Sequence, residues 1–598
     1  MPDRWIVALA ASAAIGALRP SPTPLLVGAV LSVGALLLRR PAWLCLAIAL
    51  CTSSLAQRAL DGLDGLPAAT VRAPVVLLTD PEASFNGVRS EARYAGRHVE
   101  LRAAGPAADA LRDRLAGEHL VVRATTRPGA GGDWEEVRHL AGVLTVHRVE
   151  SWGPPELPWR VANGLRRTIT AGATSLSADQ QALFSGLVLG DDRAQSAALA
   201  DDFRGAGLTH LLAVSGQNVA FVLALLGPLG RRLHLAPRLL LTLAAIGLFG
   251  VMTRFEPSVL RASAMAAVAA TAGTAGLPAQ RLRILSVALT GLLVIDPLLV
   301  RSVGFQLSVG ATIAIALMAR PIAAALPGPA WLRDAMAVTV AAQLGVAPVL
   351  LARFGPIPLA SLPANVLAVP AAGLVMGWGL TGGLLAGLAP AGAAAWLHLP
   401  SRLLLGWIGG VAQRSARLPI GEVGWVSVVV LAAAVGLMVA GSRRPTARTL
   451  GGLGRWAAVC TFAVVVMARQ APPPLRDELT AGVVRWHHGS TDVVVLGGGG
   501  WRNQPNRAEV LASLRRAGVG GIDLLVADGS DADLVAAVTT RHPTGVVVAR
   551  DPIDDLDVTP PPRTPVSAHI GDLLVTLAPG EDRTVVEARP SGVDPHGG

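Results

Sequence analysis

The 598-residue sequence contains no lysine, so arginine supplies all 51 of its basic residues and the net charge is +10. Charged residues make up only 15% of the chain, whereas hydrophobic residues make up 52%. This composition excludes an ordinary soluble multidomain protein. A GC-rich genome explains the missing lysine better than partner recognition does, although a basic excess suits an anionic partner.

Cysteine is also scarce. Cys45, Cys51 and Cys460 lie in apolar stretches, with no Cys-x-x-Cys or Cys/His spacing. This pattern indicates neither a disulfide framework nor a zinc site, and we interpret the three residues as small packing residues. Arg4 precedes the first apolar run, but two more runs follow at once, so a cleaved signal peptide is not expected.

Long uncharged runs are abundant. Those at 362–379 and 424–441 approach the roughly 20 residues that a helix needs to cross a bilayer. Three shorter apolar segments, at about 5–18, 22–38 and 41–57, form an N-terminal transmembrane region over 1–58. We therefore predict a polytopic α-helical membrane protein.

A polar stretch over 60–160 interrupts the apolar pattern. Short alternating runs at 97–101, 120–124 and 142–149 are separated by Gly, Pro and Asp clusters, which is typical of a small β-barrel or sandwich. An all-β, OB-like barrel fits the length. Phe85, Tyr94 and Trp134 are the only candidates for base stacking, so the sequence supports nucleic-acid binding here only weakly.

The segment 180–470 contains roughly eight further apolar runs and one last span at about 453–468. The run at 393–412 carries His, Ser, Arg and Gln and is predicted to lie along the interface. Strand-like and helical runs alternate over 475–590, which indicates a soluble α/β domain.

Residues 187–222 read LVLGDDRAQSAALADDFRGAGLTHLLAVSGQNVAFV, and this segment resembles the signature of the ComEC family of DNA-internalisation competence proteins. Further similar segments follow in the same order at 255–266, 296–311, 341–355 and 362–370. The signature departs from the family where a common Leu-His is replaced by Gln217-Asn218.

The resemblance implies an inner-membrane channel that moves single-stranded DNA into the cytoplasm during natural transformation. It also implies an extracytoplasmic OB-like domain before the channel core and a metallo-β-lactamase-like domain after it. The implied partners are single-stranded DNA, membrane lipid, a surface DNA receptor and a cytoplasmic DNA-translocating ATPase, since the chain has no Walker motif. Homo-oligomerisation is left open.

Polar residues in apolar helices are costly and tend to face a cavity or one another. His210, Ser215, Gln217 and Asn218 cluster in the signature, and His210 and Asn218 would share a face if the segment were one helix. Gly216 would permit a break in that helix. These residues are candidates for the DNA pathway, with an interhelical hydrogen-bond cluster as the alternative.

A second candidate group surrounds Pro257 at the start of another span. Arg254, Glu256 and Arg261 could meet a phosphate together with a helix N-terminus, or Arg254 could snorkel to the interface. Four neutral residues in the similar segments suit a lining along which a polyanion slides: Gln306, Ser308, Gln343 and Asn365.

The C-terminal domain lacks the His-x-His-x-Asp-His cluster that binds metal in metallo-β-lactamase-like folds. The strand IDLLVA is followed by Asp528, Asp531 and Asp533, with no histidine in that loop. A solvated acidic loop explains these residues better than a Mg or Ca site does. We expect no catalytic residues, no metal and no cofactor, and hence no enzyme activity.

Two other functions compete with a DNA channel. A membrane-bound metallohydrolase or nuclease is disfavoured by the missing histidines. A transporter for another anionic solute is disfavoured only by the resemblance.

The charge pattern makes a prediction about topology. Because Arg39-Arg40 and the arginines of 441–455 mark cytoplasmic turns, the 60–160 and 475–590 regions should both be extracytoplasmic. Alkaline phosphatase fused in either region should therefore be active. A silent phosphatase fusion, with an active cytoplasmic reporter at the same site, would overturn this topology.

Overall fold

The computed structural model divides the chain into two compact units, which we describe separately. Unit 1 comprises residues 1–195, 210–355 and 366–408, and unit 2 comprises residues 196–209, 356–365 and 409–598. The structure describes residues 2–63, 65–84, 87–129, 131–277, 280–326, 328–418, 422–430, 432–433, 474–497, 507–527, 532–550, 552–553, 556–580 and 584–591.

Three helices open unit 1: α1 (Asp3–Leu18), α2 (Leu25–Leu37) and α3 (Pro41–Asp61). They coincide with the three predicted N-terminal segments. Gly16 lets α1 approach α3 closely, because a Cβ at this position would lie 2.1 Å from the carbonyl oxygen of Ala49.

Six strands follow: β1 (Ala69–Leu77), β2 (Glu82–Ser84), β3 (Gly87–Tyr94), β4 (Arg97–Ala103), β5 (His119–Pro128) and β6 (Leu140–Gly153). Their order is β1-β5-β6-β4-β3-β2, and β1 also pairs with β3, so five strands close into a barrel. Val75 of β1 is opposite both Tyr94 of β3 and Leu120 of β5. Every pair is antiparallel except β4 with β6.

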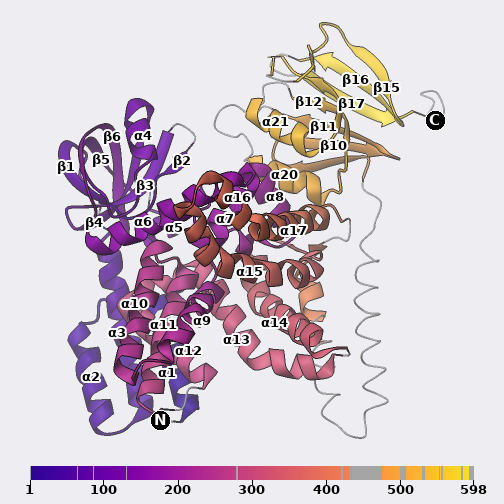
Figure 1. The fold of residues 1–598 in the computed structure, drawn as a ribbon. Helices are drawn as coiled ribbons and strands as arrows, with labels where there is room; N and C mark the ends of the chain where they lie inside the picture. The colour runs from indigo at the N-terminus through magenta and orange to yellow at the C-terminus, as the bar shows by residue number, and fades with distance from the viewer. Residues whose placement is uncertain are drawn as a thin grey trace, which may run out of the picture. The chain divides into compact units, whose positions relative to one another are not determined.

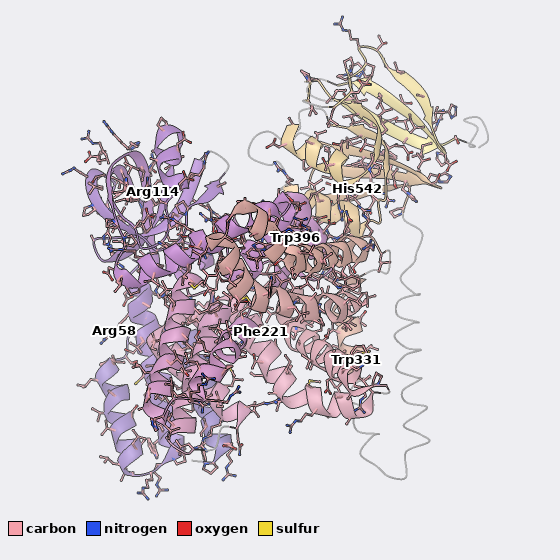
Figure 2. The ribbon with its side chains drawn as sticks, in the orientation of Figure 1. Arg58, Arg114, Phe221, Trp331, Trp396 and His542 are labelled. Atoms are coloured by element: carbon pink, nitrogen blue, oxygen red, sulfur yellow. The ribbon has the colours of Figure 1, made fainter. Side chains whose placement is uncertain are left out.

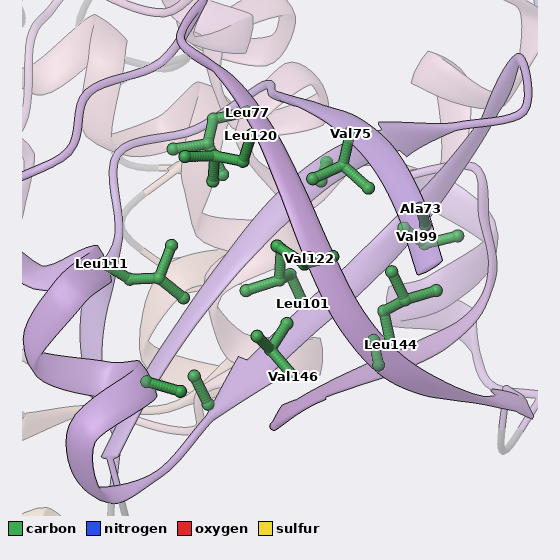
Figure 3. Close-up of a cluster of buried hydrophobic side chains, with 14 of the residues drawn as sticks. Ala73, Val75, Leu77, Val99, Leu101, Leu111, Leu120, Val122, Leu144 and Val146 are labelled. Carbon is green, nitrogen blue, oxygen red and sulfur yellow. The ribbon is translucent and has the colours of Figure 1, made fainter. Parts of the chain in front are cut away.

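Apolar side chains at alternate strand positions fill the interior of the barrel. Leu77, Leu101, Leu120 and Leu144 point inward and are almost fully buried, and Leu111 of α4 (Gly105–Arg112) lies in the same cluster (Figure 3). Burial of each such side chain contributes about 1.5–3 kcal/mol. The runs predicted at 97–101, 120–124 and 142–149 are parts of β4, β5 and β6.

Helices make up most of the chain between the barrel and the C-terminal domain, with one short helix, α5, between β5 and β6 (Figure 1). The first group is α5 (Asp133–Val137), α6 (Leu157–Gly172), α7 (Ala178–Leu189), α8 (Ala197–Gly205), α9 (Gln217–Gly230), α10 (Leu235–Met252) and α11 (Pro257–Thr274). The second group is α12 (Arg281–Ile295), α13 (Val303–Ala325), α14 (Ala330–Arg353), α15 (Ser361–Leu388), α16 (Ala391–Leu397) and α17 (Leu399–Ala416).

Five of the described helices, α3, α10, α13, α14 and α15, are long and apolar enough to cross a membrane. The apolar helices α2 and α9 are shorter. The run predicted at the interface, 393–412, divides into α16 and α17. Trp331 and Trp396, labelled in Figure 2, are exposed, as aromatic residues at membrane interfaces often are. The arginines of 443–455 and the span at 453–468 lie outside the described residues.

The C-terminal part of unit 2 is an α/β domain. Its strands are β9 (Arg476–Thr480), β10 (Val483–His488), β11 (Thr491–Leu496), β12 (Ile522–Val526), β13 (Thr544–Val548) and β14 (Val558–Thr559). They form one sheet in which each strand lies beside the next one in the chain. The pairs from β9 to β11 are antiparallel, and those from β11 to β14 are parallel.

Both faces of this sheet are covered. The helices α20 (Arg507–Arg516) and α21 (Ala532–Arg541) supply Val510, Leu514 and Val538 to one core cluster. A second sheet of β15 (Val566–Ile570), β16 (Leu573–Pro579) and β17 (Thr584–Pro590) supplies Leu573 and Val575 to another. The strand and helix types predicted here from the alternation are therefore confirmed.

Ion pairs join α8 to this domain within unit 2. Asp201, whose side chain is 1% exposed, pairs with Arg515 of α20, and Asp202 pairs with Arg541 of α21. The short strands β7 (Ile357–Pro358) and β8 (Glu422–Val423) pair nearby in the same unit.

A close glycine contact between α13 and α14 yields a stability prediction. A Cβ at Gly345 would lie 2.4 Å from the carbonyl oxygen of Gly310 and 2.6 Å from Ala314. The G345A substitution should therefore push the helices apart and cost about 1–3 kcal/mol. G377A is the control, since no atom lies within 4 Å of its added methyl group. Equal thermal unfolding midpoints for both purified variants would contradict this packing.

Candidate functional site

The signature segment is broken into separate elements. Gly207 takes a left-handed conformation with φ +65°, a short 3-10 turn covers Thr209–Leu211, and α9 begins only at Gln217. The prediction that His210 and Asn218 share one helical face is therefore wrong, because the helix does not extend back to His210. The break predicted at Gly216 is confirmed, since Gly216 is the N-cap of α9.

Two signature residues hold the segment in place. The hydroxyl of Ser215 donates to Oδ1 of Asn218 at 3.3 Å, and Nδ2 of Asn218 donates to the carbonyl of Leu187 in α7 at 2.9 Å. Asn218 is buried. This is the interhelical hydrogen-bond arrangement that was the alternative to a pathway role.

His210 and Gln217 differ from this pair because both are exposed. Among the described residues, neither side chain has a hydrogen-bond partner. Neither of these side chains is therefore held by a described hydrogen bond, whereas Ser215 and Asn218 are.

Arg261 of α11 lies next to the break. Its side chain is buried, Nε donates to the hydroxyl of Ser308 in α13 at 2.7 Å, and Nη1 contacts the sulfur of Met265 at 3.2 Å. A Cβ at Gly216 would lie 2.8 Å from Nη2 of Arg261. No described carboxylate forms an ion pair with this guanidinium group, so a buried positive charge faces the start of α9.

A hydrogen bond also joins α11 to the signature, and another holds the start of α13 to the turn before it. Ser258, one turn before Arg261, donates to the carbonyl of Val214 in the signature at 2.8 Å. Gln306 donates to the carbonyl of Val300 at 2.8 Å. The signature, α11 and α13 thus meet around Arg261 and Ser308.

Three more of the predicted residues are Asn365 of α15, Glu256 at the start of α11 and Gln343 of α14. Nδ2 of Asn365 donates to the carbonyl of Ser361 at 2.7 Å, and Asn365 is buried. Glu256 is the N-cap of α11 and is exposed. Gln343 lies in the middle of α14.

Arg254 takes part in a different arrangement, a cluster of buried charges. Its guanidinium group donates to Oδ1 of Asp80 at 2.7 and 3.1 Å and to Oδ1 of Asn163 at 2.9 Å, and it lies over the ring of Trp159. Arg254 and Phe255 both have positive φ, near +57° and +54°. This left-handed backbone costs roughly 1–2 kcal/mol per residue, so the contacts must stabilise it.

Arg166 completes the cluster. It donates to Oδ2 of Asp80 at 2.8 Å, to Asp191 at 3.1 Å, and to the carbonyls of Leu189 and Met252, both at 2.7 Å. Those carbonyls lie at the C-terminal ends of α7 and α10, where unpaired acceptors favour a cation. One guanidinium group therefore joins the barrel to two helices.

Burial by itself would raise the pKa of the Asp80 carboxyl group, but the charges of Arg166 and Arg254 outweigh it and hold the pKa below its usual range. The sequence analysis missed Asp80, Asn163 and Arg166. Nothing in the local pattern of Asp80 marks it, while Arg166 lies in an amphipathic helix outside the apolar runs.

No metal centre is found among the described residues, in which no three His, Cys, Asp or Glu side chains converge. His487 instead contacts Asp492 at 2.9 Å, and Arg485 donates to the same carboxylate at 2.6 Å. Asp528 and Asp531 lie outside the described residues.

Five helices long and apolar enough to cross a bilayer, with buried polar and charged side chains among the helices, are typical of a membrane protein. Residues 187–445 match the family model described as Competence protein. The resemblance to ComEC proteins is therefore confirmed, and it rests on this part of the chain.

One curated protein illustrates the similarity. The ComE operon protein 3 of Bacillus subtilis (strain 168) is 26% identical over 251 residues. The alignment covers 41% of this chain and 32% of that protein, so the chain spans about a third of its relative's length. No solved structure matches the chain.

The charge cluster makes a stability prediction. D80N should cost about 3–5 kcal/mol, because it leaves buried guanidinium groups without their carboxylate. E150Q is the control, since Glu150 pairs with Arg72 at the exposed surface, where such a pair adds little. The measurement is thermal unfolding of the purified full-length chain in detergent.

The difference should also depend on pH. The folded-state pKa of Asp80 is depressed. Its contribution to the free energy of unfolding is therefore complete above the unfolded-state pKa of about 4 and is lost as the pH falls through the folded-state pKa. Wild type and D80N should therefore converge in strong acid. A D80N variant as stable as E150Q at neutral pH would contradict this account.

Proposed function

We propose that the protein is a multi-pass inner-membrane channel that conducts single-stranded DNA into the cytoplasm. The observation that carries the proposal is Arg261: a buried guanidinium group without a described carboxylate partner, beside the break in the competence signature. A charge at the centre of a membrane helix costs about 2.5–3.5 kcal/mol on insertion scales. A passing phosphate would supply the missing counter-charge.

The groups around Arg261 fit conduction rather than tight binding. Ser308 is a neutral hydrogen-bonding residue, and Gln217 and His210 are exposed on the same signature segment. A lining of neutral donors with one cation attracts a polyanion without trapping it.

The two soluble parts complete the proposal. The barrel has five closed strands, one parallel pair and a helix between β4 and β5, which supports an OB-type fold. The sheet flanked by α20 and α21 supports a metallo-β-lactamase-like fold. We propose that this domain has no nuclease activity, because its sequence lacks the metal-binding histidines.

Energy and delivery must come from other proteins. The sequence has no Walker motif, so the proposal includes a cytoplasmic ATPase that pulls the strand and a surface receptor that presents it.

The test separates conduction from packing. R261Q and H210A should each reduce uptake of labelled DNA in the native host, with protein abundance and surface DNA binding unchanged. For R261Q we expect at least about a tenfold loss, since a charge-assisted hydrogen bond contributes about 1.5–3 kcal/mol. R320Q, at an exposed position on α13, is the control.

Three outcomes are informative. Lower uptake at normal abundance supports the proposal. Parallel losses of abundance and uptake assign Arg261 a structural role, and normal uptake in both variants removes these residues from the pathway. Uptake of another anion instead of DNA would identify a different transporter.

A further inference from the structure

An open groove lies between three neighbouring helices of unit 1, α9, α10 and α11, which are side by side in Figure 1. Its volume is about 450 Å³, within the range of small-molecule pockets. Apolar side chains form most of its lining: Leu223, Leu226, Leu239, Ala266, Ala269 and Ala270.

One end of the groove is cationic. Arg238 lines it together with Gly230 and Leu235, at the turn where α9 ends and α10 begins, and Thr274 lines it at the end of α11. Arg238 is exposed, and no described carboxylate pairs with it.

More arginines lie beside this end in the chain. Arg231 and Arg232 are in the turn between α9 and α10, and Arg281 and Arg283 begin α12. No Asp or Glu occurs over residues 203–255 or 257–295. The positive charge at the end of the groove is therefore not neutralised by its own helices or turns.

We propose that this groove binds one acidic phospholipid. An acyl chain lies along the leucines and alanines, and the headgroup phosphate contacts Arg238, with Arg231 and Arg232 beside it. The combination of an apolar channel with a basic end matches the two chemical halves of such a lipid.

The lining favours a lipid over a DNA strand. Single-stranded DNA is held by a continuous basic track and by aromatic rings that stack on its bases. None of the residues that line this groove is aromatic, and Arg238 is the one charged residue among them. One of the three helices that form the groove, α10, is also long and apolar enough to span the membrane.

Two glycines allow the groove to be filled without disturbing the fold. A Cβ at Gly227 or Gly273 would meet no atom within 4 Å, although both residues line the groove. G273L, next to Thr274, should therefore block the groove where the acyl chains join the headgroup. G247L is the matched control, since Gly247 of α10 is equally open but does not line the groove.

The experiment is native mass spectrometry of the purified full-length chain, titrated with phosphatidylglycerol or with phosphatidylcholine of the same acyl chains. The wild type should retain phosphatidylglycerol preferentially. R238Q should weaken the binding of phosphatidylglycerol by about fivefold, because one basic residue near a headgroup contributes about 1 kcal/mol. The binding of phosphatidylcholine should be unchanged. G273L should weaken the binding of both lipids, whereas R320Q and G247L should leave the binding of both unchanged.

Several results would overturn the proposal. A wild type without preference for phosphatidylglycerol would do so irrespective of any variant. Equal retention of phosphatidylglycerol by R238Q, G273L and the two control variants would also overturn it. If R238Q no longer binds a labelled thymidine oligonucleotide that the wild type binds, while its lipid binding is unchanged, the basic end is a nucleic-acid contact. Thermal unfolding in the same detergent verifies that each variant is folded.

Discussion

The arrangement of unit 1 depends on one buried carboxylate, that of Asp80, between the guanidinium groups of Arg166 and Arg254. Asp80 lies in the connection between β1 and β2 of the barrel domain, Arg166 in α6, and Arg254 in the turn between α10 and α11. Each guanidinium group also satisfies acceptors elsewhere, including the carbonyls that end α7 and α10. Because an unpaired buried charge is very unfavourable, the barrel and these helices are stable only in a mutual position that keeps all of these contacts.

That constraint extends to the signature. The turn held by Arg254 leads directly into α11, whose Ser258 and Arg261 contact the signature segment. Gly216 permits this approach because it has no side chain, and Asn218 fixes the start of α9 to α7. The pathway residue that we propose, Arg261, is therefore positioned by packing that begins at the barrel.

Much of this fold could be predicted from the sequence, and the reasons are local. Alternation revealed β4, β5 and β6, apolar length revealed α3 and α15, and Gly216 indicated a helix break. The contacts could not be predicted in this way. Asp80 and Arg254 are 174 residues apart, and nothing near Asp80 in the sequence distinguishes a buried carboxylate from an exposed one. The shared helical face of His210 and Asn218 was wrong because one glycine and a 3-10 turn interrupt the periodicity.

The central claim is that the chain moves DNA across the membrane rather than capturing it outside. The most direct measurement deletes the protein in its native host and scores two quantities separately: labelled DNA bound at the cell surface and labelled DNA protected from added nuclease. The account predicts normal surface binding and a loss of protected single strands, restored by the wild-type chain. Unchanged protected DNA in the deletion strain, or loss of surface binding itself, would contradict it.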